Sequence, residues 1–529
     1  MARTTNGNIL FIMCDQLRWD YLSCYSHPYI DTPNIDRLAA SGVRFTRAYC
    51  QAPLCGPSRA SFYTGRYMSS HGVMANKDPL KLGELTLGDY LRTIGMRTVL
   101  TGKSEASANR RALRRLGVDE TRGTGLFVSQ NGFESYEHFA GLYPDPILPQ
   151  DLGYNEYLRA HGYGGENPWE SYANSAVDTS GRVVSGWQMR NSGLPALVPE
   201  PRSETAFTTD RAIEFLKSVS PKERWCLHLS YIKPHWPYLA PAPYHSIYGP
   251  GDTAAATRHP DELVDPHPVY SAFMRQTYSR NFSRDEVRDR VVPTYMGLIK
   301  QVDDHLGRVI RSLEVRGMYD STLIVFTSDH GDYLGDHWLG EKDLFHEPSV
   351  HIPLIVRDPD ARADATRGTT QEAFAEAVDI VPTLVDFAGG TAVEERMEGR
   401  SLLPLLRGAG ATIGWRDQAI SEIDYSERGP RRLLGLHPRD CRAWMVRNDG
   451  WKYIFYEGFP PQLFDLVNDP CEFRDLGNDA GYRGVQREMH ERLFTWLRRR
   501  RTRTEVPTAT LFDKGPERDE EMGILIGHW

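Results

Sequence analysis

Continuous apolar runs of strand length are the clearest pattern along the chain. They span residues 8–14 and 322–327, and a third strand is predicted over residues 225–231, where His228 and Ser230 stand among apolar residues. Polar or charged residues follow each of these strands within a few positions. A run without alternation is typical of a parallel strand that is covered on both faces. We therefore predict an α/β fold with a mostly parallel central sheet. Folds of this class bind ligands at the carboxyl ends of their strands, and three polar residues stand at those places: Asp15, His235 and Asp329.

Helical periodicity is strongest in residues 293–317. Five apolar side chains, spaced by three or four positions, form one stripe that we predict to face the core: Leu298, Val302, Leu306, Val309 and Leu313. Gly317 ends this helix. Further helices are predicted over residues 33–41 and 379–388. These helices are expected to flank the sheet.

The pattern changes beyond a glycine-rich stretch near residues 389–410. Short runs rich in aromatic and β-branched residues follow at 444–446, 451–456 and 462–466, and a basic helix is predicted over 482–500. Short runs of this kind indicate antiparallel strands. We therefore predict a catalytic domain over residues 1–400 and a small C-terminal α+β subdomain over 401–529.

An apolar segment closes the chain. Four of its last six residues are large and hydrophobic: Ile524, Leu525, Ile526 and Trp529. A cluster of this kind is unlikely to stay in water. We expect the tail to pack on a neighbouring subunit and to give a homodimer or a homotetramer.

Composition and charge narrow the possible partners. The 529 residues include 40% hydrophobic and 25% charged residues, which is ordinary for a protein with a substantial core. A net charge of −8 gives no reason to expect binding to nucleic acid, so an anionic substrate would need a local cationic pocket. The seven cysteines form no CxxC pair, and no export signal or membrane span is predicted. We expect a reduced, cytoplasmic protein.

Cys55-Gly-Pro-Ser-Arg59 carries the candidate chemistry. Pro57 suits the first turn of a helix, so Cys55 lies at a helix N-terminus, where free N–H groups favour an anion. Arg59 follows one turn later and can bind the same anion. Taken alone, the pattern also fits a buried cysteine ahead of a capped helix. The longer string from Cys55 to Thr-Gly-Arg66, however, resembles the motif of the sulfatase family, in which the cysteine is oxidised to formylglycine.

Other landmarks of the resemblance lie in the right order along most of residues 8–400. They are Asp15, Gly-Lys103, Lys-Pro-His235-x-Pro, Ser-Asp329-His330-Gly and Lys342. The resemblance implies an alkaline-phosphatase-like α/β sandwich. Gln16 and His330 stand where many sulfatases have Asp and Asn, which resembles the phosphonate monoester hydrolases and related arylsulfatases. Glu105 stands where sulfatases commonly have a His.

The resemblance also implies a role for each residue of the site. One divalent metal ion, Ca²⁺ or Mn²⁺, would be bound by Asp15, Asp329, His330 and the modified Cys55. Three cationic side chains would neutralise the substrate oxyanions: Arg59, Lys103 and Lys342. His235 or Lys342 would protonate the leaving group. Gln16 and Asn76 would donate to non-bridging oxygens, and a formylglycine-generating enzyme would mature the chain.

We predict the first of three functions and keep the other two as alternatives. The first is hydrolysis of sulfate esters, aryl sulfates above all, which Lys103 favours. The second is hydrolysis of phosphonate monoesters or phosphodiesters at the same site, which Gln16 with His330 favours. In both cases the partner is a small anionic ester. The third is a non-catalytic anion-binding protein in which Cys55 stays a thiol.

Overall fold

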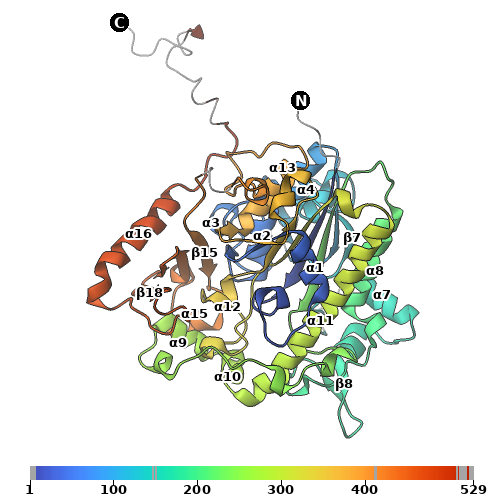
Figure 1. Cartoon of the computed structure of the whole chain (residues 1–529), viewed down its shortest axis with the longest axis horizontal. Coiled ribbons are helices and arrows are strands. Elements are labelled where there is room, and N and C mark those ends of the chain that lie inside the picture. Colours follow the sequence, from blue (N-terminus) through green and yellow to red (C-terminus); the bar gives the residue numbers. More distant parts are fainter. Residues whose placement is uncertain are drawn as a thin grey trace.

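An eight-stranded sheet forms the centre of the computed structural model, which describes residues 7–105, 107–145, 148, 152–409, 414–507, 510 and 521–523. Its strands lie in the order β13 (Thr369–Gln371), β2 (Val43–Phe45), β12 (Leu354–Arg357), β11 (Thr322–Ser328), β1 (Asn8–Asp15), β10 (Trp225–Pro234), β5 (Arg97–Gly102) and β7 (Glu134–His138). Only β12 runs antiparallel to its neighbours, so the sheet is mostly parallel, as predicted (Figure 1).

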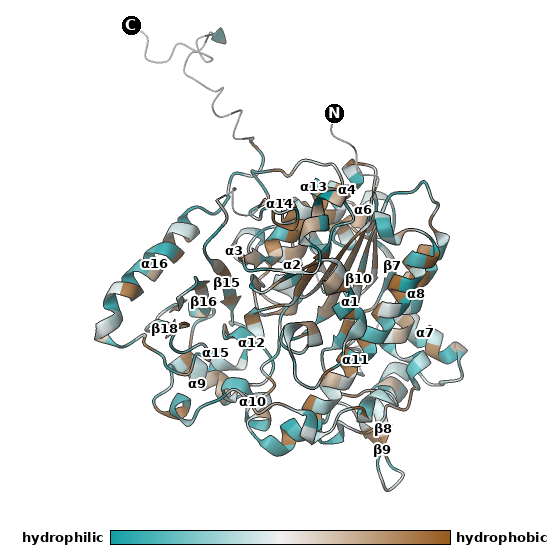
Figure 2. Ribbon diagram, viewed as in Figure 1, coloured by the Kyte–Doolittle hydropathy of each residue, from teal (hydrophilic) through white to brown (hydrophobic). Residues whose placement is uncertain are grey.

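Both faces of the sheet are covered, which explains the unbroken apolar runs. Along β1, Ile9, Phe11 and Met13 join one buried cluster, while Leu10, Ile12 and Cys14 join the other. The first cluster includes α2 (Cys55–Thr64), α4 (Leu87–Thr93) and α13 (Ile380–Phe387); the second includes α1 (Pro33–Ser41), α8 (Glu204–Ser218) and α11 (Asp285–Val315). The central strands stand out as the brown interior of Figure 2. The predicted α/β architecture with flanking helices is confirmed.

The longest helix, α11, begins eight residues before its predicted start at Pro293. All five residues of the predicted stripe are buried, as expected. Pro293 has no N–H to donate to the carbonyl oxygen of Asp289. The helix tolerates this loss because Asp289 is exposed, so water can take the place of the missing donor. The proline therefore lies inside the helix and does not mark its start.

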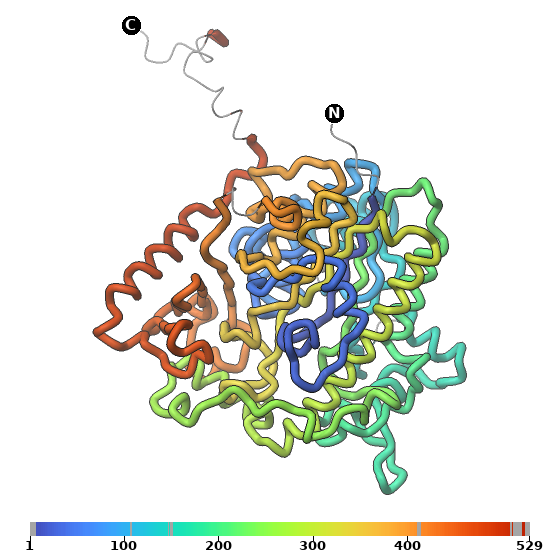
Figure 3. Tube along the Cα trace, viewed as in Figure 1, coloured from blue at the N-terminus to red at the C-terminus, as the bar shows by residue number. Residues whose placement is uncertain are grey.

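The C-terminal sheet is antiparallel, as predicted, with the order β15 (Ala419–Asp424), β16 (Arg442–Arg447), β17 (Trp451–Tyr456) and β18 (Gln462–Asp465). Helix α16 (Arg483–Arg498) covers one face through Met489 and Leu493. The other face contributes Ala443 and Ile454 to the same buried cluster as β1. In Figure 3 this part of the chain, orange to red, lies along one side of the molecule. Because the two parts share a core, the boundary near residue 400 stays a prediction.

A buried glutamate on β15 makes the stability of this junction depend on pH. Glu422 accepts hydrogen bonds from the Ser69 backbone N–H at 3.0 Å and from the Trp444 indole at 3.1 Å. Burial raises the pKa of Glu422 to about 7. Between the unfolded pKa and this folded pKa the native state binds the extra proton, so stability falls as pH rises toward neutrality.

We therefore expect Glu422→Gln to be stabilising relative to the wild type at pH 8 but not at pH 5. The free energy of unfolding of the variant relative to the wild type should rise by roughly 2–3 kcal/mol over that interval. Melting temperatures of the two proteins, measured at both pH values, check this. Parallel pH profiles would show that Glu422 is already ionised in the folded protein.

Shorter elements fill the two long segments between the strands and helices of the core. The region 107–205 contains α5 (Arg110–Arg115), α6 (Gly123–Ser129), α7 (Gly153–Ala160) and the hairpin β8 (Ser175–Val177) to β9 (Val183–Ser185). The region 240–290 contains α9 (Pro268–Met274) and α10 (Thr277–Phe282). The remaining strands and α-helices in the described part of the chain are β3 (Ala48–Tyr49), β4 (Pro79–Leu80), β6 (Ser107–Ala108), β14 (Ala375–Glu376), α3 (Met68–His71), α12 (Glu347–Val350), α14 (Leu403–Leu406) and α15 (Gly429–Leu434).

Three expectations concern partners and surroundings. Ile524, Leu525, Ile526 and Trp529 lie outside the described residues, so the oligomerising tail stays a prediction. All seven cysteines lie in the described part of the chain, and none is in a disulfide. Within the described ranges, no helix combines the length and the apolar character needed to cross a bilayer.

Candidate active site

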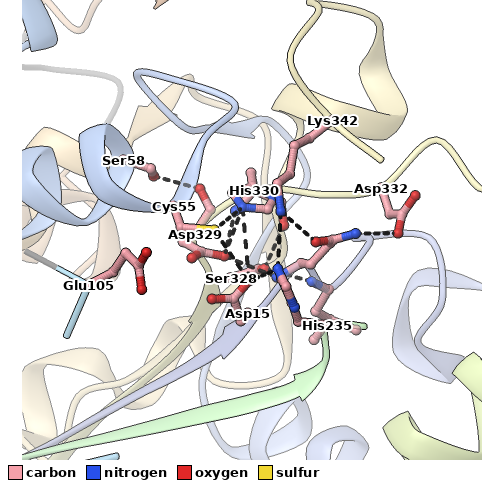
Figure 4. Close-up of polar contacts among 12 residues, drawn as sticks. Asp15, Cys55, Ser58, Glu105, His235, Ser328, Asp329, His330, Asp332 and Lys342 are labelled. Atoms are coloured by element: carbon pink, nitrogen blue, oxygen red, sulfur yellow. Dashed lines mark hydrogen bonds and ion pairs between the residues drawn. The ribbon is translucent and has the colours of Figure 1, made fainter. Parts of the chain in front are cut away.

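Four predicted metal ligands meet at the carboxyl edge of the sheet. Asp15 is the last residue of β1, Asp329 and His330 follow the adjacent parallel strand β11, and Cys55 is the first residue of α2. One ligand atom from each residue lies within 4.8 Å of the others, and all four residues are buried. Figure 4 shows their side chains converging on one point. The sequence-based prediction that these residues lie together agrees with this geometry.

The chemistry of this group fits one divalent cation. The Nδ1 atom of His330 lies 2.9 Å from the carbonyl oxygen of Gly331 and donates to it, so Nε2 keeps its lone pair. That Nε2 atom lies 3.3 Å from Cys55 Sγ, and Asp15 Oδ1 lies 3.7 Å from the same sulfur. Two carboxylates and one imidazole suit a hard to borderline divalent ion. Whether the ion is Ca²⁺ or Mn²⁺ stays a prediction.

Arg59 lies beneath the carboxylates and is fully buried. Its Nε donates to Asp329 Oδ2 at 2.8 Å and its Nη2 to Asp15 Oδ2 at 3.1 Å. Its Nη1 donates to the carbonyl oxygen of Lys103 and to Ser230 Oγ, both at 2.8 Å. This geometry makes Arg59 a positioning residue for the two metal-binding carboxylates. The direct contact with substrate that the sequence suggests stays a prediction.

Lys103 lies on the other side of Asp15. Its Nζ is 2.7 Å from Asp15 Oδ2 and 3.5 Å from Glu105 Oε2. Burial alone would lower the pKa of Lys103, but the negative charge of Asp15 holds it above its usual value. Glu105 has a φ of 53°, an unusual conformation for a non-glycine residue, and its carboxylate is a second counter-charge for Lys103.

Lys342, His235 and Gln16 form a second polar group above the ligands. The Nζ atom of Lys342 donates to Gln16 Oε1 at 2.7 Å and lies 3.2 Å from His235 Nε2. The Nδ1 atom of His235 lies 2.6 Å from the carbonyl oxygen of Trp236, so Nδ1 carries a proton and Nε2 accepts from Lys342. Of the two candidate proton donors, Lys342 is therefore the one that holds the shared proton.

Hydrogen bonds fix both the backbone and the side chain of Gln16. Its backbone N–H donates to Asp329 Oδ1 at 3.0 Å, and its Nε2 donates to Asp332 Oδ2 at 2.5 Å. Asp332 is buried and also accepts from the hydroxyl of Tyr238 at 2.6 Å. The sequence reasoning missed Asp332 and Tyr238. Asp332 could have been found, because it lies only two residues after His330.

The last predicted residue, Asn76, supports the start of α2. Its Oδ1 accepts from the backbone N–H of Gly56 at 2.8 Å, which satisfies one of the free donors of the first turn. Asn76 also lines the cavity that opens over Cys55. The structure therefore brings every predicted site residue to the same region.

The cavity over Cys55 has a volume of about 1220 Å³. Lys103, His235 and Lys342 line it close to the ligand cluster. Its outer wall is rich in aromatic residues: Tyr143, Trp187, Trp236 and Tyr278. Two of these residues, Tyr143 and Trp187, come from the long segment between β7 and α8.

Comparisons with known proteins agree with this geometry. A model of the Sulfatase family matches residues 7–390. The chain belongs to the sulfatase family. A second family model, N-sulphoglucosamine sulphohydrolase, C-terminal, matches residues 335–499. The resemblance and the alkaline-phosphatase-like fold predicted from the sequence are thus confirmed.

Individual members of the superfamily match over nearly the whole chain. The multifunctional alkaline phosphatase superfamily protein PehA of Trinickia caryophylli is 32% identical over 93% of this chain and 95% of its own length. The arylsulfatase of Clostridium perfringens is 27% identical over 90% of this chain and 91% of its own. The phosphonate monoester hydrolase SpPMH from Silicibacter pomeroyi superposes with a TM-score of 0.82 at 29% identity, over 94% of this chain and 96% of its own. This sulfatase is therefore a hydrolase of the superfamily.

Proposed function

We propose that this sulfatase is a formylglycine-dependent hydrolase of aryl phosphonate monoesters and phosphodiesters, with aryl sulfates as second substrates. One observation carries the proposal. The side chain of residue 55 lies 3.3 Å from His330 Nε2 and 3.7 Å from Asp15 Oδ1, in a cavity that Lys103 and Lys342 also line. A nucleophile at this position faces the cations that would hold an anionic ester.

The size of the cavity and the similarity to known enzymes support phosphonate monoesters and phosphodiesters as the first substrates and sulfates as the second. A phosphonate monoester or a phosphodiester carries two organic groups on phosphorus, whereas a sulfate monoester carries one. The cavity of about 1220 Å³ offers room for both groups. Likeness to a phosphonate monoester hydrolase and to PehA supports the same order. Lys103 and the likeness to an arylsulfatase favour sulfates as the second class.

Residue 55 would supply the nucleophile. Hydrated formylglycine offers one hydroxyl for in-line attack on phosphorus or sulfur, which forms an ester and expels the aryl oxide. Loss of the proton from the second hydroxyl then restores the aldehyde and breaks the bond to the transferred group. An ester of plain Ser or Cys has no such second hydroxyl. A divalent cation bound by residue 55, Asp15, Asp329 and His330 would supply positive charge against the developing oxyanion.

The other side chains would bind, orient and move protons. Lys103 lies beside Asp15 and would hold a non-bridging oxygen. Lys342 would give a proton to the departing oxygen. The Nε2 of His235 would then stabilise the neutral amine of Lys342 by accepting a hydrogen bond from it. Gln16 keeps Lys342 in place, and Arg59 keeps Asp15 and Asp329 in place.

Lys342→Ala should slow the hydrolysis of esters with poor leaving groups most. Without the proton donor, a phenoxide must leave with its full charge, whereas p-nitrophenoxide tolerates that charge. We expect a loss of about two decades for a phenyl ester and less than one decade for a p-nitrophenyl ester. Rates across a series of substituted phenols, plotted against leaving-group pKa, measure this. Lys77→Ala is the control, because Lys77 is an exposed lysine on the same cavity. Equal losses for both esters would remove Lys342 from the role of acid.

Side-by-side kinetics test the proposed function. Matched p-nitrophenyl esters of phenylphosphonate, of a phosphodiester and of sulfate should all be hydrolysed, with kcat/KM highest for the phosphonate or the diester. A higher value for the sulfate would reverse the order of the substrate classes. No turnover of any ester by protein that carries formylglycine would refute the proposed function.

A further inference from the structure

A second hollow adjoins the active-site cavity. It has a volume of about 1310 Å³ and shares Trp187 and Tyr278 with the cavity over Cys55. Its walls come from residues 178–191, which include β9 and the turn that joins it to β8, and from residues 277–290, where α10 meets α11. Figure 1 shows α10 and the hairpin along the same lower edge of the molecule. A substrate group that extends past Trp187 and Tyr278 would enter this hollow.

Four arginines line the hollow, and only two of them are paired. Arg182 lies 3.1 Å from Asp178, and Arg284 lies 3.0 Å from Glu286. Arg190 and Arg290 form no ion pair with any described carboxylate; the Nη1 of Arg290 donates only to the backbone carbonyl oxygen of Arg190, at 3.3 Å. Both acidic residues of the wall are thus paired with an arginine. The guanidinium groups of Arg190 and Arg290 remain without a counter-charge among the described residues.

A concave surface with uncompensated charge attracts ions of opposite sign. The chain as a whole carries −8, so the cationic hollow differs in sign from the protein around it. Guanidinium groups bind carboxylate, sulfate and phosphate in a two-pronged geometry. The amide side chains of Gln188, Asn191 and Asn281 also line the hollow and offer further hydrogen bonds.

We propose that Arg190 and Arg290 form a second anion-binding subsite, which recognises a carboxylate, sulfate or phosphate on the organic group of the substrate, beyond the ester that is cleaved. The inference rests on the proposed function, because it places that organic group in the cavity that leads from residue 55 to Trp187 and Tyr278. The preferred substrate is then an ester with two separate anionic ends. Trp187 and Tyr278 flank the path between them.

A matched pair of substrates tests the subsite. One is a p-nitrophenyl phosphonate whose phosphonate substituent ends in a carboxylate; the other ends in the neutral carboxamide of the same shape. Tethers of increasing length should reveal one length at which kcat/KM of the carboxylate ester exceeds that of the amide by about tenfold. Because screening weakens exposed charge contacts, this ratio should fall as salt is added.

Variants of the four arginines show which of them cause the preference for the carboxylate ester. Arg190→Gln and Arg290→Gln should each lower the carboxylate-to-amide ratio, and the double variant should bring it near one, while turnover of the neutral ester stays unchanged. Arg182→Gln and Arg284→Gln remove the same charge from the same hollow, but these arginines are already paired, so they should keep most of the ratio. Equal losses in all four variants would show general attraction rather than a subsite and would overturn the proposal.

Calorimetry provides a readout that does not depend on turnover. Carboxylate-terminated phosphonic acids of every tether length, without the p-nitrophenyl group, are titrated. The one that binds the wild type most tightly should bind it about tenfold more tightly than the Arg190→Gln/Arg290→Gln double variant. Equal dissociation constants would refute the subsite. If the neutral ester is hydrolysed but the carboxylate brings no gain at any length, the inference fails and the proposed function stands. If no ester is hydrolysed while the affinity difference persists, the proposed function fails and the subsite stands.

Discussion

Cys55→Ala should reduce turnover of every ester substrate by about four decades or more, because it removes the group that attacks phosphorus or sulfur. Alanine keeps the helix start at position 55 and leaves Asp15, Asp329 and His330 in place. The remaining site could still bind an anion, so substrate affinity should change much less than turnover. Initial rates at saturating substrate, together with a dissociation constant for phenylphosphonate, separate the two effects.

Two companion variants sharpen this prediction. Cys50→Ala changes another buried cysteine five residues upstream and should keep activity. Cys55→Ser should be inactive as well when only a cysteine-specific maturation enzyme is present, because an unmodified serine ester lacks the second hydroxyl that releases the product. Turnover of Cys55→Ala close to that of the wild type would exclude residue 55 as the nucleophile.

Asp329→Asn should abolish metal binding and reduce turnover by about three decades. The Asp329 carboxylate accepts from Arg59 Nε, from the backbone N–H of Gln16 and from the backbone N–H of His330. An asparagine has the same shape but presents an N–H group to one of these donors and carries no charge for the cation. The loss should therefore affect both the metal and the orientation of Arg59.

Metal content and thermal stability measure this effect without relying on activity. Dialysed wild-type protein should contain close to one divalent ion per chain, and its melting temperature should rise when Ca²⁺ or Mn²⁺ is added after chelation, since a ligand that binds only the folded state stabilises it. The variant should show neither. Asp332→Asn is the control, because Asp332 lies in the same loop, bonded to Gln16 and Tyr238 and outside the ligand cluster. Two ions per wild-type chain would contradict the single site.

The sequence predicted the parts of the fold that hydrophobic burial alone specifies. Strands β1, β10 and β11 are buried on both faces, so their sequences are mostly apolar, and the buried His228 and Ser230 of β10 are the polar exceptions within the strands. Because Asp15 and Asp329 each come at the end of a buried parallel strand, the sequence also predicted that they lie at one edge of the sheet. Strand β15 escaped notice because two acidic residues on it, Glu422 and Asp424, are buried and break the apolar pattern.

The arrangement of the polar groups was harder to predict. The loop that delivers Lys342 contains several non-glycine residues with positive φ, including Leu334, His337, Glu341 and Asp343. A backbone of this kind has no period, so nothing in the sequence showed that Lys342 would contact Gln16. The position of Arg59 was also hidden. Its motif predicts that Arg59 binds an anion of the substrate. In the structure, Arg59 binds the carboxylates of Asp15 and Asp329.

Mass spectrometry of the peptide that contains residue 55 tests the central claim most directly. Protein produced together with a formylglycine-generating enzyme, shown to hydrolyse p-nitrophenyl phenylphosphonate, should be digested and its residue 55 examined. We predict a residue that has lost the sulfur of cysteine and gained an aldehyde oxygen, in a fraction that rises in proportion to the specific activity of different preparations. Fully active protein that contains only unmodified Cys55 would contradict the account.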